Sequence, residues 1–166
     1  DDIKVFVDQV PEIRDIAPVV SRSDTLYIRG NAQPVSVLGV TPAYERVRNL
    51  VMVRGRFFTE QEEAGAAKVC VISRELAERL FGRADVEDEW LRLFNLRFRI
   101  VGMYREGVES AAAVGKSEAA GLVAMMPLSS LRNVSDARFI DVVYVQASDR
   151  EAIFEVKRGM AEVITS

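Results

Sequence analysis

The chain has 166 residues, of which 49% are hydrophobic and 28% charged, a balance typical of one folded domain and not of a disordered segment. Its 22 lysine and arginine residues against 25 aspartate and glutamate residues give a net charge of −3, so nothing electrostatic favours binding to DNA or RNA. Histidine is absent, which excludes triads with a histidine base and metal sites built on imidazole.

The chain contains a single cysteine, Cys70, so it can form no disulfide within itself and no cysteine-based zinc site. No signal peptide is visible, and no run of about 18 apolar residues could span a bilayer. Because the sequence starts at Asp1-Asp2 without a methionine, we expect it to be a piece excised from a longer protein.

The first quarter of the chain predicts a short helix and then a β-hairpin. Residues 2–10 carry apolar side chains at helical spacing, and Pro11 ends that helix. Residues 12–29 are extended, Gly30-Asn31 is a hairpin turn signal, and residues 35–40 form the return strand.

Short helices and strands alternate through the middle of the chain. Thr41 and Pro42 open a helix as capping hydroxyl and first helical residue, and residues 51–58 are extended. The sequence from Thr59 to Glu62 fits a capping box at the start of a short acidic helix.

A compact apolar strand at residues 68–72 follows, and Ser73 caps the next helix, which Gly82 ends. Residues 90–104 hold two strands with a turn near Asn95.

The last third begins with a stretch, from Glu106 to Gly121, that is rich in alanine, glycine, serine and glutamate. We predict a mobile loop there, which is either an element that contacts a partner or a disordered crossover with no role of its own. A strand at 122–126, a short helix at 127–131, a strand at 140–146 and a long final helix at 149–164 complete the chain. This order of elements predicts an α+β fold with a mixed sheet.

Acidic residues form two clusters, which are listed here: Asp85, Glu87, Asp88 and Glu89; Glu60, Glu62 and Glu63. Carboxylates are the ligands that Ca²⁺ and Mg²⁺ prefer, but neither cluster has EF-hand spacing, and runs of charge are usually solvated. We therefore expect no metal site, no catalytic residue and no cofactor. The alternative is a soluble ligand-binding or hydrolytic domain, which requires a deep pocket lined by two or more of the first four acids.

Two potential nucleophiles have simpler structural explanations. Cys70 lies in the apolar run 69–72, where a cysteine is usually a small buried hydrophobe. Ser73 follows a strand and begins a helix, but the glycines of a nucleophile elbow are missing and no histidine can act as base, so capping is favoured.

Four arginines share one region with three aromatic residues, and these are Arg92, Arg97, Arg99, Arg105, Trp90, Phe94 and Tyr104. If the arginines lie on one sheet face, they form a candidate RNA-binding surface. The acidic net charge favours an ordinary solvated strand face instead.

Several stretches carry the pattern of a known family, namely VLGVTPAY at 37–44, VMVRGRFFTE at 51–60, KVCVIS at 68–73, LFG at 80–82 and FRIVGM at 98–103. In this order and spacing they resemble the periplasmic core domain of MacB-type ABC transporter permeases, the FtsX-like superfamily. Residues 122–131 are similar to the strand and short helix that follow in the family. At residues 85–90 the chain departs from the family's usual Pro-x-Gly turn.

The resemblance implies an extracytoplasmic domain between the first two membrane helices of a permease at the bacterial inner membrane. It implies two lobes: a porter-like lobe from residues 1–40 and 127–166, and an inserted α/β lobe from about 41–126. The implied partners are an ABC ATPase subunit or domain, a second permease as homodimer or heterodimer, and a periplasmic adaptor protein. Nucleic acid is not among them, and the membrane is contacted only through flanking helices.

The same resemblance implies that the domain hydrolyses no ATP and passes ATP-driven motion to a substrate or partner outside the membrane. The biological setting would be efflux, lipoprotein handling or envelope signalling. We expect the first and last residues to lie together at one end, with the helix at 149–164 acting as a rigid lever.

Overall fold

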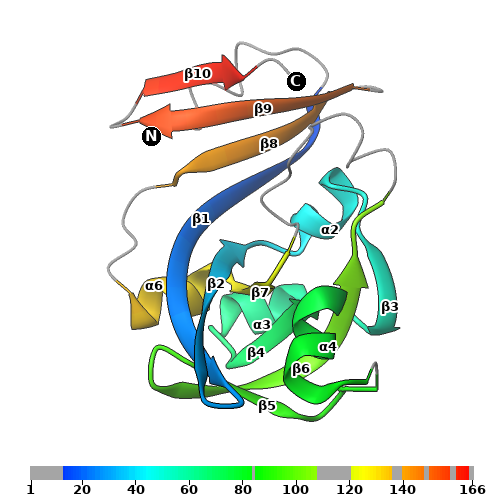
Figure 1. Ribbon diagram of the computed structural model, residues 1–166. Helices are drawn as coiled ribbons and strands as arrows, with labels where there is room; N and C mark the ends of the chain where they lie inside the picture. The colour runs from blue at the N-terminus through cyan, green and yellow to red at the C-terminus, as the bar shows by residue number, and fades with distance from the viewer. Residues whose placement is uncertain are drawn as a thin grey trace.

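The computed structural model describes residues 13–83, 85–107, 121–135, 140–147, 150–157 and 160–164. Ten strands form one sheet in the order β10-β9-β8-β1-β2-β7-β4-β6-β3, and β5 also pairs with β6 (Figure 1). The strands are β1 (Ile13–Ile28), β2 (Asn31–Val40), β3 (Val51–Gly55), β4 (Val69–Ser73), β5 (Trp90–Leu93), β6 (Leu96–Arg105), β7 (Val123–Pro127), β8 (Val142–Ala147), β9 (Arg150–Lys157) and β10 (Met160–Ile164). The helices are α2 (Ala43–Val47), α3 (Glu60–Ala64), α4 (Arg74–Phe81) and α6 (Leu128–Val134).

The predicted α+β class with a mixed sheet is confirmed. The pairs β2–β7 and β4–β6 are parallel, whereas the other strand pairs are antiparallel. The predicted hairpin is also present, since Ile28 pairs with Asn31 across the turn at Arg29-Gly30. Gly30 has φ of 81°, in the region that glycine enters without steric cost.

Strict alternation of buried side chains gives the sheet two apolar faces. In β2, Val35 and Val37 belong to one core cluster, while Leu38 and Val40 belong to the other. All six strands β1, β2, β7, β4, β6 and β5 contribute to the first cluster, so the sheet curls around it and α4 packs against it. The second cluster lies on the opposite face, where α2 covers β1 and β8.

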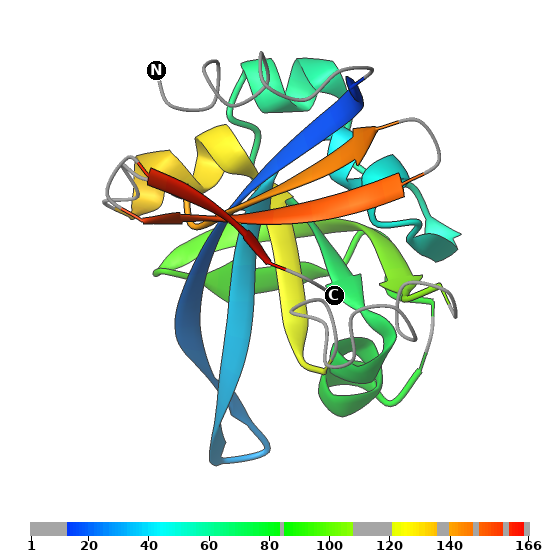
Figure 2. The same ribbon diagram turned by 90° about the horizontal axis from the view of Figure 1, so that it is seen from above.

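Strand β1 connects the two ends of the molecule. Its first half pairs with β8 from Ile13 to Val19, and its second half pairs with β2 from Val19 to Ile28. Val19 is paired on both sides, with Val142 of β8 and Val40 of β2. Figures 1 and 2 show β1 running from the layer of β8, β9 and β10 down to the turn with β2.

The helix caps follow the local sequence in three of four places. Thr59 forms the predicted capping box, Ser73 accepts a hydrogen bond from the Leu76 N–H, and Gly82 ends α4 with a left-handed φ of 68°. The prediction that the Thr41 hydroxyl caps α2 is wrong. Pro42 holds the N-cap position without a side-chain hydrogen bond, and Thr41 contributes only its carbonyl, which accepts from the Tyr44 N–H at 3.0 Å.

The predicted final helix is wrong, because residues 150–157 and 160–164 form the hairpin of β9 and β10. β9 extends the sheet by pairing Ile153 with Tyr144 of β8. Residues 150–157 contain isoleucine, phenylalanine and valine, which also suit a strand, and the free edge of β8 decides between the two structures. The prediction that this segment acts as a rigid helical lever is therefore also wrong.

Four predictions have no test in this structure. The helix at 2–10 and most of the loop at 106–121 lie outside the described residues, as do the first and last residues of the chain. The division into lobes at residues 40 and 127 also stays a prediction. We note that β2 and β7, on either side of that predicted boundary, pair directly.

Ser73 joins the start of α4 to β7, which makes it a test of this part of the fold. Its hydroxyl donates to the Gly121 carbonyl at 2.6 Å and accepts from the N–H groups of Leu76 and Val123, both at 3.2 Å. Ser73→Ala leaves these buried groups unsatisfied, and we expect the free energy of unfolding to fall by about 2–3 kcal/mol. Urea unfolding followed by Trp90 fluorescence measures it. Thr59→Ala, at an exposed cap, should cost only about 1 kcal/mol.

Candidate functional site

Three of the four acidic residues at 85–89 form ion pairs with arginine. Arg83 Nε lies 3.1 Å from Asp85 Oδ1, and Arg83 also forms an ion pair with Glu89. Arg99 Nε donates to Asp88 Oδ1 at 2.9 Å. Among the described residues, no group of three or more histidine, cysteine, aspartate or glutamate side chains could hold a metal ion. These carboxylates therefore have a structural role in the loop before β5.

That loop also replaces the family turn that is missing from the sequence. Asp88 has φ of 70°, and its N–H donates to the Ile100 carbonyl at 2.9 Å. Aspartate tolerates this left-handed conformation better than most residues, so it can make the turn without glycine.

The second acidic cluster belongs to helix α3 and its surroundings. The hydrogen bond from Arg56, with N–O distances of 2.9 and 3.0 Å to the two carboxylate oxygens, holds the pKa of Glu62 below its ordinary value. Burial raises the pKa of Glu63, although its carboxylate accepts from the Ser129 N–H at 3.2 Å. Glu62 thus completes the capping box, and Glu63 fixes α3 to α6.

Neither potential nucleophile is available for chemistry. Cys70 is fully buried in the first core cluster, and burial raises the pKa of its thiol far above the ordinary value. Ser73 is buried and uses its hydroxyl for the three hydrogen bonds described above. Both residues occupy the places that their sequence contexts predicted.

Three of the four candidate arginines come together, and the fourth does not. In the β5–β6 ladder, Trp90 pairs with Arg99 and Arg92 pairs with Arg97. The Arg97 guanidinium stacks over the Trp90 ring at 4.7 Å. Arg105 pairs instead with Val51 of β3, at the far end of β6. Arg105 therefore lies apart from the other three arginines.

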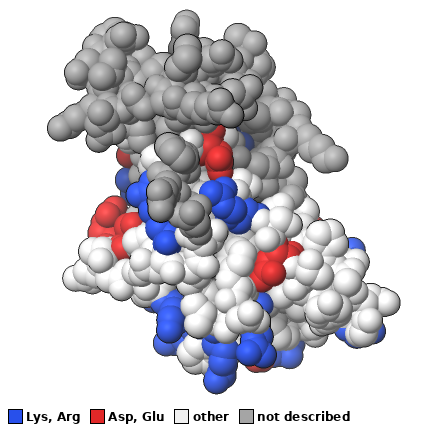
Figure 3. Space-filling model, turned by 90° about the vertical axis from the view of Figure 1, so that its left-hand side faces the viewer, with Lys and Arg blue, Asp and Glu red and all other residues white. Residues whose placement is uncertain are grey.

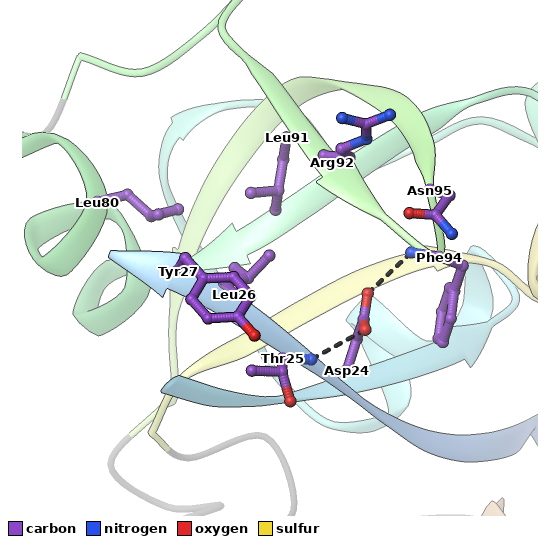
Figure 4. A pocket seen from close by; sticks show the side chains of 9 residues that line it. All are labelled: Asp24, Thr25, Leu26, Tyr27, Leu80, Leu91, Arg92, Phe94 and Asn95. Carbon is purple, nitrogen blue, oxygen red and sulfur yellow. Dashed lines mark hydrogen bonds between the residues drawn. The ribbon is translucent and has the colours of Figure 1, made fainter. Parts of the chain in front are cut away.

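A pocket of about 450 Å³ lies beside this arginine surface, between β1 and β5. Its lining residues are Asp24, Thr25, Leu26, Tyr27, Leu80, Leu91, Arg92, Phe94 and Asn95 (Figure 4). It includes none of Asp85, Glu87, Asp88 and Glu89, so it does not supply the acidic site that the alternative reading requires.

Sequence reasoning missed this pocket because its two walls are about one third of the chain apart. Tyr27 gave the best available signal, since it stands at a solvent-facing position of a strand and is 79% exposed. Asp24 gave no signal in the sequence. Its carboxylate accepts a hydrogen bond at 2.8 Å from the N–H of Phe94, in the turn that follows β5, and this contact exists only in the folded chain.

A second group that the sequence did not reveal is the buried arginine of α2. Arg48 is only 1% exposed, and its guanidinium lies 4.2 Å from the centre of the Tyr144 ring on β8. Tyr44, one turn earlier, meets the same ring edge-on at a centroid distance of 5.8 Å. These contacts hold α2 against the part of the sheet where β1 changes partner.

Solved structures show that this fold is shared with extracytoplasmic domains of bacterial transporters. The extracellular domain of the noncanonic ABC-type transporter YknZ from Gram-positive bacteria matches with a TM-score of 0.70 and 19% identity, over 89% of this chain and 71% of that chain. The periplasmic region of MacB from Actinobacillus actinomycetemcomitans matches with a TM-score of 0.68 and 18% identity, over 89% and 64%.

Sequence comparison then gives the particular family. The family model for the MacB-like periplasmic core domain matches residues 1–163, and the chain belongs to this family. The macrolide export ATP-binding/permease protein MacB of Bdellovibrio bacteriovorus is 27% identical over 165 residues, which is 99% of this chain and 25% of that protein. The pyoverdine export ATP-binding/permease protein PvdT of Pseudomonas aeruginosa is 22% identical over 93% of this chain and 23% of its own length.

The predicted family and its periplasmic location are therefore confirmed: this is the periplasmic core domain of a MacB-like ABC transporter permease. The chain spans about a quarter of the length of these two exporters. In the part of the chain that the structure describes, no helix is long and apolar enough to cross a membrane.

The ion pair of Glu62 with Arg56 predicts a pH-dependent contribution to stability. The pKa of Glu62 is lower in the folded state than in the unfolded chain, so its contribution is present above the unfolded pKa of about 4.3 and is lost as the pH falls through the folded pKa. Glu62→Gln should lower the free energy of unfolding at neutral pH by about 0.5–1 kcal/mol.

Urea unfolding at a series of pH values tests this, and the two stability curves should converge once the pH lies below both pKa values. Glu60→Gln serves as the control, because Glu60 is an exposed residue of the same helix, two positions before Glu62. Its stability should vary with pH as that of the unmodified chain does. A constant difference between Glu62→Gln and the unmodified chain at every pH would contradict the assignment.

Proposed function

We propose that this domain is a non-catalytic module that transmits ATP-driven motion of the permease to a substrate or partner outside the membrane. The observation that carries the proposal is the double pairing of Val19, which makes β1 a continuous connection between β8 and β2. Alternate residues of β1 direct their backbone groups to opposite sides, so ladder hydrogen bonds to β8 and to β2 hold the strand around Val19, and bending there would break them. A displacement of β8–β10 is therefore carried along β1 to its turn with β2.

Packing around the change of partner supports the same conclusion. Ala17 and Val19 are completely buried, and they belong to one cluster with Tyr44 and Tyr144. Protein interiors of this kind are close-packed and transmit strain instead of absorbing it. The beginning of β1 pairs with β8, so the described ends of the chain lie in the same layer, where a force from flanking membrane segments would enter.

The proposed setting is a complete transporter. The ATPase is a domain of the same protein or a separate subunit, the permease forms a dimer, and an adaptor or a substrate receives the motion. The named relatives are exporters of macrolides and of pyoverdine, which favours efflux over lipoprotein handling or signalling. A hydrolytic role is disfavoured, since Asp85, Asp88 and Glu89 pair with arginine and Glu63 accepts a hydrogen bond from α6.

The test measures motion directly in the full-length transporter. Tyr27→Cys places a spin label near the β1–β2 turn, and Cys70 stays unlabelled because it is fully buried. In a transporter with no other accessible cysteine, we expect the label-to-label distance across the dimer to change by several ångström between the ATP-bound and nucleotide-free states. Pulsed electron paramagnetic resonance measures this distance.

A flexible insertion in β1 provides the matched perturbation. Two glycines inserted after Val19 keep the alternation of side chains but interrupt the ladder, so ATP hydrolysis should continue while the distance change is lost. Two glycines inserted after Gly82, in an exposed turn, should leave the change intact. An unmodified transporter that hydrolyses ATP with no movement at position 27 would refute the proposal.

A further inference from the structure

The second half of β1 has a sheet edge without a strand partner. β8 leaves β1 at Val19, and from there to Ile28 the described strands provide only β2 as a neighbour. β5 likewise pairs with β6 alone. The two open edges face each other across the pocket of about 450 Å³, so the curled sheet is left incomplete between β1 and β5 (Figure 4).

Side-chain carboxylates occupy part of the place of the missing strand. The Ser21 N–H donates to Asp141 Oδ2 at 2.8 Å, and the Thr25 N–H donates to Asp24 Oδ1 at 2.9 Å. Alternate residues of a strand direct their backbone groups to the same side, so those of Ser23 and Tyr27 also point away from β2. Such an edge is a template for another extended chain.

Asp24 also sets the width of the opening. Its second carboxylate oxygen accepts from the Phe94 N–H at 2.8 Å, which bridges β1 to the end of β5 and closes the pocket there. Toward Tyr27 and Leu91 no such bridge is present among the described residues, and the pocket is open. An extended segment could therefore enter from the Tyr27 side, with one end directed at Asp24.

The walls of the pocket indicate which side chains such a segment would carry. Leu26, Leu80, Leu91 and Phe94 provide an apolar lining beneath the exposed ring of Tyr27, which fits one large apolar side chain. Pockets of this size accept groups of that kind.

The positive charge beside the pocket favours an acidic residue next to that apolar side chain in the bound segment. Arg92 lines the pocket and forms no ion pair with any described residue, and Arg97 lies directly across the ladder from it. Figure 3 shows basic side chains gathered at the end of the molecule that carries the β1–β2 turn and β5.

We propose that the cleft between β1 and β5 binds an extended peptide segment of a partner protein. The segment adds to the edge of β1 from Tyr27 toward Asp24, places a large apolar side chain in the pocket and directs a carboxylate to Arg92. This is strand addition to a sheet edge, in which backbone hydrogen bonds supply affinity and the pocket supplies specificity. The inference goes beyond the proposed function, since binding requires neither ATP nor motion.

The experiment uses the 166-residue chain and a blocked heptapeptide of alternating threonine and valine, with phenylalanine at its centre followed by glutamate. Trp90, half exposed at the start of β5, reports binding by fluorescence, and amide chemical shifts locate it. We expect saturable binding with shifts confined to residues 21–28 and 90–97. Tyr27→Ala and Arg92→Ala should each weaken it about tenfold, equivalent to about 1.4 kcal/mol.

Matched controls separate strand addition from other binding. Val53→Ala alters an exposed residue on β3, another strand that pairs with β6 alone, and should leave the affinity unchanged. A peptide N-methylated at alternate residues on its bonding edge should not bind, and lysine in place of glutamate should weaken binding. Both domain variants change exposed side chains, and an unaltered Trp90 spectrum shows that they are folded.

Three results would overturn the proposal. These are equal affinity for the N-methylated peptide, chemical shift changes at β3 instead of β1, and self-association of the chain through the cleft with no peptide binding. None of them would affect the spin-label test, so this inference and the proposed function can fail separately.

Discussion

The double pairing of Val19 is the constraint on which the rest of the molecule depends. At that residue β1 has β8 as its paired neighbour on one side and β2 on the other, so one strand belongs to both parts of the sheet. Burial of Ala17 and Val19 beneath α2, against the tyrosines of α2 and β8, prevents water from replacing the ladder hydrogen bonds around this residue. The same change of partner that makes β1 continuous also leaves its second half with an open edge. Mechanical connection and the cleft beside β5 therefore have a single structural origin.

Several charged residues stabilise local structure through ion pairs. Asp85, Asp88 and Glu89 engage Arg83 and Arg99, and Glu62 engages Arg56 while it caps α3. Exposed ion pairs of this type contribute little each, so the fold rests on its two apolar clusters. Arg92 differs from these arginines because it remains without a carboxylate partner in the described structure.

Much of the local structure could be predicted from short stretches of sequence. The hairpin at Gly30, the caps at Thr59 and Ser73 and the end of α4 at Gly82 all depend on contacts within a few residues. The final helix failed for the opposite reason. Its apolar spacing suits a helix, but the pairing of Ile153 with Tyr144, nine residues earlier, makes the segment a strand. The cleft could not be predicted, because Asp24 and Phe94 are 70 positions apart in the sequence.

The amino-acid sequence by itself determined the class of the protein. The missing histidine, the single buried-type cysteine and the family pattern from Val37 to Met103 were enough to predict a MacB-like core domain with an α+β fold. Tertiary structure alone decided which strands have a free edge, that Arg48 is buried, and that Arg92 lines a pocket. The physical reason is that helix caps and turns are satisfied by neighbours in the chain, whereas strand edges and pockets are formed by residues that only folding brings together.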